Sequence, residues 1–219
     1  MKLDHLFDQV TEFNNVITNA KPGSRQLVTG LNGSSKTVFI NGIYKNLTRS
    51  MVIVTDTLAH ADQLTADLAN LIADDQLFEF PVEEIGASEL ATSSPEYKSL
   101  RVLALNKLAS GEPAVIVTST SGIRRILPTR EQFASAHLKI SLGDEFNLAD
   151  LKIQLHQMGY SMQKMVAAPG EFSIRGSIVD IYPLSDDNPV RIDFFDTEVD
   201  SMRSFNVADQ RSIENVESS

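Results

Sequence analysis

The stretch "VTGLNGSSKTVFI", Val28 to Ile40, reads as a strand end, a loop and the start of a helix, and it is close to a phosphate-binding loop. In the pattern G-x-x-x-x-G-K-[ST], backbone N–H groups surround the phosphates, the Lys reaches the outer ones and the hydroxyl holds Mg²⁺. Counted back from Lys36 and Thr37, the second glycine of the pattern should stand at position 35, where this chain has Ser35. The stretch predicts a nucleotide-binding type of domain whose loop departs from the pattern at one position.

Ser35 matters because a glycine there would let the backbone approach a phosphate with no Cβ in the way. Hydrolysis also needs an acidic pair that holds Mg²⁺ and orients water, usually at the end of a buried strand. The run 113–122 ends in Thr and Ser, and Asp56, which ends the run 50–56, is a single acid and an ordinary helix N-cap. We expect no catalytic residue and no bound cofactor. The expected degenerate phosphate loop consists of Gly30, Gly33, Ser35, Lys36 and Thr37.

The first half of the chain alternates strand and helix patterns. Apolar runs at 50–56 and 113–122 predict buried strands, and the apolar run 25–30 predicts a strand that ends at Gly30. A helix is expected from about Ser35 to Asn46. Another helix should begin after Ser94, with Pro95 at its first position, and end before Gly111. Strands alternating with helices predict an α/β domain with a parallel sheet covered on both faces.

The pattern changes after Leu127 and Pro128. A capping box, Thr129 to Gln132, begins a short helix, and the segment 147–158 has the apolar spacing of a stronger one. Two extended segments follow, separated by "LSDDN", and they predict antiparallel strands. The predicted fold is therefore α/β: a P-loop-type parallel-sheet half-domain followed by a smaller β-rich α+β domain.

Composition limits the functions that the chain can have. A net charge of −10 argues against a DNA-gripping surface, although the basic run 123–130, "IRRILPTR" with its three arginines, stays open as a local patch. The chain contains no cysteine, and its four histidines are scattered, so we expect no metal site. No apolar run is long enough to cross a bilayer, and the first residues lack the pattern of a secretory signal. We expect a cytoplasmic protein that does not bind membranes.

The run "GEFSIRGSIVDIYPLSDDNPVRIDFFDTEVDSMRSFNVADQRS", residues 170–212, resembles the bacterial transcription-repair coupling factors. The resemblance extends over essentially the whole chain and identifies it with the module of that family that is similar to the UvrB protein of nucleotide excision repair. It implies a first half-domain at 1–135, an inserted β-rich domain at 136–212, and at 213–219 the truncated start of a return to the first domain. The chain would then be a fragment.

The resemblance also implies a function. In the family this module binds the UvrA repair protein and other domains of its own full-length chain, while the ATP-dependent DNA translocase activity lies in a later helicase region. The aromatic hairpin with which UvrB probes DNA would fall at residues 79–98, which are acidic and contain few aromatics, so no direct DNA binding is expected. The alternative is a working nucleotide-binding or ATPase domain of a DNA-repair helicase.

The candidate partner site is Arg175, Arg191 and Phe195. In "PVRIDFFD" one side of the strand is apolar, so Arg191, Asp193 and Phe195 should share the outer face. Arginine and aromatic residues are over-represented at binding hot spots. By resemblance, the coupling factors bind UvrA through Arg, Arg and Phe at these three motif positions. The alternative is that Phe195 packs under the preceding helix and Arg191 pairs with Asp193.

Overall fold

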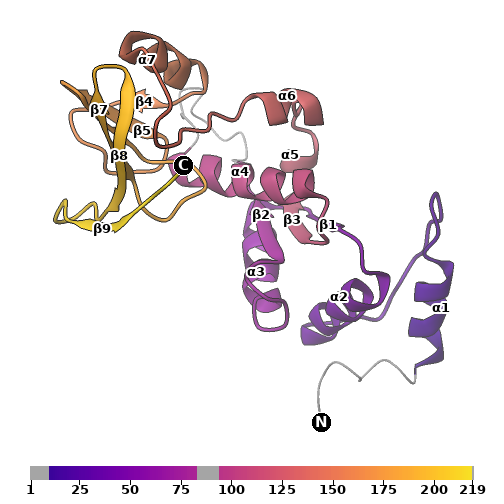
Figure 1. The fold of residues 1–219 in the computed structure, drawn as a ribbon. Helices are drawn as coiled ribbons and strands as arrows, with labels where there is room; N and C mark the ends of the chain where they lie inside the picture. The colour runs from indigo at the N-terminus through magenta and orange to yellow at the C-terminus, as the bar shows by residue number, and fades with distance from the viewer. Residues whose placement is uncertain (1–9, 83–93, 219) are drawn as a thin grey trace. The chain divides into compact units, whose positions relative to one another are not determined.

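The computed structural model describes residues 10–82 and 94–218. The chain divides into two compact units, residues 1–91 with 104–125 and residues 92–103 with 126–219. The mixed class predicted from the sequence is confirmed, because one unit carries a parallel sheet with helices and the other a β-rich sheet (Figure 1). The predicted borders at 135/136 and 212/213 stay predictions. No helix among the described residues is long and apolar enough to cross a membrane.

The first unit is built on a three-stranded parallel sheet of order β1-β3-β2. Its strands are β1 (Met51–Thr55), β2 (Leu77–Phe80) and β3 (Val115–Ser119). Its helices are α1 (Thr11–Asn19), α2 (Ser34–Leu47), α3 (Leu58–Leu68) and α5 (Thr120–Ile123), and the dividing point 103/104 lies within α4 (Pro95–Ser110). The predicted positions of α2, α4, β1 and β3 are confirmed to within a few residues.

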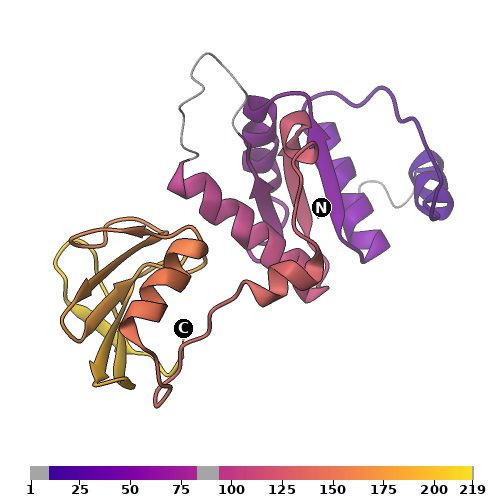
Figure 2. The same cartoon turned by 90° about the horizontal axis from the view of Figure 1, so that it is seen from above.

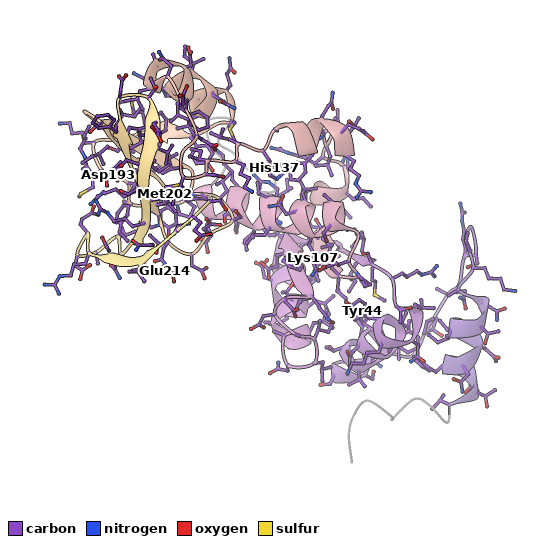
Figure 3. The ribbon with its side chains drawn as sticks, viewed as in Figure 1. Tyr44, Lys107, His137, Asp193, Met202 and Glu214 are labelled. Carbon is purple, nitrogen blue, oxygen red and sulfur yellow. The ribbon has the colours of Figure 1, made fainter. Side chains whose placement is uncertain are left out.

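Central strand β3 is buried on both faces, and each face belongs to a different apolar cluster. Val115 and Val117 pack with α2 and α3, whereas Ile116 packs with Ala104 of α4. Tyr44, labelled in Figure 3, joins α2 to the segment before β3, because its hydroxyl donates to the carbonyl oxygen of Pro113 at 3.0 Å. Burial raises the pKa of that tyrosine above its usual value.

Two predictions for this unit are wrong. The run 25–30 was expected to be a strand, but among the described residues it pairs with no strand, and Leu27 is 89% exposed. Nor is the sheet covered on both faces at its β1 edge, where Val52 is 55% exposed. Val52 is in register with Ile116, which α4 covers. The apolar cluster on that face includes β2 and β3 residues but no side chain of β1.

The second unit contains a six-stranded sheet of order β4-β5-β6-β7-β8-β9, antiparallel apart from the parallel pair β4 and β5. Its strands are β4 (Ser161–Met162), β5 (Glu171–Arg175), β6 (Ile178–Ile181), β7 (Val190–Phe195), β8 (Glu198–Phe205) and β9 (Ser212–Asn215). The helices are α6 (Arg130–Ser135) and α7 (Leu148–Gln157). The segment expected to begin a return to the first domain thus contributes most of β9 to this sheet.

Both helices of this unit begin as their sequences predict. Thr129 and Gln132 form the capping box of α6, and the side chain of Asn147 caps α7. Helix α7 lies on one face of the sheet (Figure 2), where Leu151 and Leu155 are buried against the strands. The core on this face also contains Phe172, Val179, Ile181, Val190, Ile192, Phe194, Val199 and Met202. The opposite face of the sheet carries the polar side chains.

Candidate functional site

The alternation predicted for β7 is confirmed. Val190, Ile192 and Phe194 are buried in the core, whereas Arg191 and Asp193 are half-buried on the other face and Phe195 is exposed. Asp193 on β7 and Met202 on the neighbouring β8 are labelled in Figure 3. The polar face of the sheet therefore carries Arg191, Asp193 and Phe195.

Strand register brings a carboxylate to the centre of this face. Residues Ser173, Asp180, Arg191 and Arg203 lie side by side on β5, β6, β7 and β8. Cross-strand neighbours on one face have Cβ atoms within about 5.5 Å of each other, close enough for side chains to pair. The face thus places an acid directly beside Arg191.

Asp180 binds both candidate arginines. Its Oδ1 accepts from Nε of Arg191 at 2.7 Å, and its Oδ2 accepts from Nη2 of Arg191 at 2.9 Å and from Nη2 of Arg175 at 2.6 Å. The side chain of Asp180 is 0% exposed. A buried carboxylate is tolerated only when it is paired and hydrogen-bonded, and the two arginines satisfy that condition. The hydrogen bond to Asp180 is also the main reason that the pKa of Arg191 is raised.

Arg191 has two further contacts that fix its orientation. Its guanidinium carbon lies 4.5 Å from the ring centroid of Phe205, within the range of a cation–π interaction. Its Nη2 also donates to Oε1 of Gln210, on the turn between β8 and β9, at 3.1 Å. The side chain is consequently only 18% exposed, whereas that of Arg175 is 43% exposed. The two arginines share an acceptor but differ in how much surface they offer.

Phe195 lies at the end of β7 and is 77% exposed. The alternative for this strand is wrong in both parts: Phe195 does not pack under a helix, and Arg191 pairs with Asp180. Asp193 instead accepts from Nη2 of Arg203 at 2.6 Å and from the hydroxyl of Ser201 at 3.2 Å. The structure joins Arg175 and Arg191 through Asp180 and places Phe195 on the same side of β7 as Arg191.

Three residues of this site escaped the sequence prediction: Asp180, Phe205 and Gln210. A signal for Asp180 was available, since a single acid stands within the apolar run "SIVDIY". In an antiparallel pair of strands, that acid can lie opposite an arginine of the next strand. Phe205 and Gln210 follow from the register of β8 and from the turn after it, which the sequence pattern does not fix.

The segment expected to be a degenerate phosphate loop has glycines in the backbone conformation that glycine favours, but its N–H donors bond within the segment. Gly30 and Gly33 have φ values of 84° and 52°, in the region that glycine favours. The backbone N–H groups of Ser35 and Lys36 donate to carbonyl oxygens of Asn32 and Gly33, at 3.2 and 3.1 Å. The Ser35 hydroxyl also bonds both backbone groups of Asn32. In a working loop such N–H groups would face the phosphates.

The two side chains that follow are placed differently. Lys36 is exposed, whereas Thr37, whose hydroxyl would hold Mg²⁺ in the intact pattern, is buried with 5% exposure.

Asp56 does not cap α3 as expected, because Thr57 is the N-cap residue. Asp56 instead bonds the imidazole of exposed His60 at 2.5 Å, and that hydrogen bond is the main reason that its pKa is lowered.

The basic run and the acidic region bear on DNA binding. Arg124, Arg125 and Arg130 are all exposed, and the division between the units falls at 125/126. Residues 83–93, most of the region compared with the UvrB hairpin, lie outside the described residues.

In the described part of the chain, His, Cys, Asp and Glu side chains form no group of three or more that could hold a metal ion.

Residues 138–219 match the model of a family described as the UvrB interaction domain. Curated relatives include a transcription-repair-coupling factor of Bacillus subtilis, 42% identical over 94% of this chain, and that of Staphylococcus aureus strain NCTC 8325, 36% identical over 87%. The chain spans only 18% and 16% of the lengths of these relatives. The resemblance drawn from the run 170–212 is confirmed.

Proposed function

We propose that the chain is a protein-interaction module, because it is a relative of the transcription-repair-coupling factors and its residues 138–219 match the UvrB interaction domain. In this proposal it recruits the UvrA repair protein to stalled RNA polymerase in the cytoplasm, and other domains of the full-length protein are further partners. The observation that carries the proposal is the polar face of the second sheet. There an exposed Phe195 extends from the strand that also presents Arg191.

The chemistry of this face suits a protein surface that carries carboxylates. Arginine gives short, charge-assisted hydrogen bonds to carboxylates, and an exposed aromatic ring can fill an apolar recess. A phenylalanine that is 77% exposed loses its contact with water on binding, which favours association. Arg175, Arg191 and Phe195 thus offer the mixture of charge and apolar area that is typical of hot spots.

In the same proposal the chain itself is not catalytic, binds no cofactor and does not bind DNA directly. The N–H groups of Ser35 and Lys36 are already bonded within the loop, so a nucleotide would have to break those bonds to be bound there. ATP hydrolysis and DNA translocation would belong to other regions of the full-length protein. The loop geometry thus supports the interaction module over the alternative of a working ATPase domain.

The test is a titration of purified UvrA protein into the parent chain and into Phe195→Ala, measured by calorimetry. We expect Phe195→Ala to weaken binding by about 2 kcal/mol or more, as hot-spot residues do. The matched control is Ile153→Ala on α7, which also removes an exposed apolar side chain, from the helix that packs on the opposite face of the sheet. Failure of the parent to bind, or equal binding by Phe195→Ala, would contradict the proposal.

A further inference from the structure

Asp180 presents an unusual arrangement for a residue on the polar face of a sheet. Its side chain is fully buried, although the two arginines that it pairs with on that face are partly exposed to solvent. The three hydrogen bonds to its carboxylate oxygens come from Arg175 and Arg191. The acid therefore lies beneath the two guanidinium groups and leaves their outer sides for solvent or a partner.

The donors that remain on each arginine follow from these bonds. A guanidinium group has five N–H donors. Arg191 gives its Nε–H to Asp180 and the two N–H groups of Nη2 to Asp180 and Gln210, which leaves those of Nη1. Arg175 gives one N–H of Nη2 to Asp180. Each arginine thus keeps donors for a second carboxylate while the first holds it in place.

Holding these side chains in place has a consequence for binding. Ordering a long side chain at an interface costs about 0.5–1.5 kcal/mol, and that cost is avoided when the side chain is already ordered in the unbound protein. The stack on Phe205 and the bond to Gln210 restrict Arg191 in the same way. The arginines of the face are therefore ordered before any partner arrives.

We propose that Asp180, assisted by Gln210, is a positioning residue that presets Arg175 and Arg191 for the carboxylates of a protein partner. This inference rests on the proposed function, because it concerns the same face. Asp180 itself does not touch the partner. It sets the direction in which the remaining N–H groups of the arginines point.

The first experiment compares Asp180→Asn with Val179→Ala in the full 219-residue chain, using purified UvrA protein as the probe. Val179 is the preceding residue of β6, fully buried on the core side, so its truncation lowers stability without touching the arginines. We expect Asp180→Asn to weaken binding about tenfold, because two ordered side chains are released. Val179→Ala should leave the dissociation constant within about twofold of that of the parent.

The second experiment tests whether Asp180 acts through the arginines. In a chain that already carries Arg175→Gln and Arg191→Gln, the further change Asp180→Asn should have almost no effect on UvrA binding. A tenfold effect in that background would show that Asp180 contributes by another route and would overturn the proposal. If Asp180→Asn does not fold, Gln210→Gly replaces it, since glycine adopts the φ of 59° at that position. It should weaken binding about threefold by releasing Arg191 alone, and unchanged binding would overturn the proposal.

The third measurement needs no partner. Nitrogen-15 NMR of the arginine side chains should show a slowly exchanging Nε–H for Arg191 in the parent, compared with that of Arg211, which is 85% exposed. If the two exchange equally fast, or if Asp180→Asn binds UvrA as the parent does, the positioning role is wrong even though the parent binds. If the parent fails to bind UvrA, the proposed function fails and the positioning role fails with it.

Discussion

Replacing Arg191 by alanine should destabilise the second unit, because it leaves a fully buried carboxylate with one partner instead of two. Removing one member of a buried ion pair costs about 3–5 kcal/mol. The lower end applies here, since Arg175 keeps its bond to Asp180 and Arg191 is 18% exposed. Loss of the contact with Phe205 adds roughly 0.5–1 kcal/mol. We expect a total of about 3.5–4 kcal/mol.

The other two site residues provide the comparison. Arg175→Ala removes one hydrogen bond from a side chain that is 43% exposed, so it should cost about 1 kcal/mol. Phe195→Ala removes an exposed ring and should change stability by less than about 0.5 kcal/mol. Truncating an exposed side chain should leave the melting temperature nearly unchanged. Arg191 is not such a side chain, because it is only 18% exposed and pairs with a buried carboxylate.

The assay is urea unfolding followed by far-UV circular dichroism, because the chain contains no tryptophan for fluorescence. Hydrogen exchange of the amides in β6, β7 and β8 assigns the loss of stability to the second unit. For a unit of this size, about 3.5 kcal/mol corresponds to a fall of at least about 10 °C in melting temperature. If Arg191→Ala lies within about 0.5 kcal/mol of the parent, or if Phe195→Ala is the most destabilised, the reasoning from Asp180 is refuted.

Three further predictions concern the first unit and the charge of the chain. Calorimetric titration of the chain with Mg-ATP should show no micromolar binding. The substitution Ser35→Gly alone should give no ATP turnover, because no acidic pair accompanies the loop. Measurable hydrolysis would contradict this. Because the chain has a net charge of −10, it should not change the gel mobility of duplex or single-stranded DNA at physiological salt. A salt-sensitive complex would contradict this and would direct attention to the run 124–130. The hydrogen bond to His60 lowers the pKa of the Asp56 carboxyl in the folded chain. This bond should therefore stabilise the folded chain at pH values above the pKa that Asp56 has in the unfolded chain. The stabilisation should be lost as the pH falls through the pKa that Asp56 has in the folded chain. The substitution His60→Ala should return the pKa of Asp56 toward its usual value, as measured by NMR titration of the carboxyl groups. An unchanged pKa would exclude His60 as the cause.

The sequence determined the class of each unit and the local boundaries of many elements. Thr129, Gln132 and Asn147 cap their helices as expected, since capping depends on a few neighbouring residues. The alternation of β7 was equally readable, because successive side chains of a strand point to opposite faces. Arg191 and Phe195 were placed on the outer face for that reason.

Tertiary structure decided what those side chains contact. The run 25–30 contains the apolar pair Leu27 and Val28 of the expected strand, yet a strand forms only where another strand supplies hydrogen bonds, and no described strand does so. Arg191 pairs with Asp180 instead of Asp193 because the register of β6 against β7 sets a neighbour eleven residues away in sequence beside it. Pairing between strands depends on register, which no single strand specifies. The sequence therefore predicted the residues of the polar face, and only the fold showed the buried carboxylate that holds two of them.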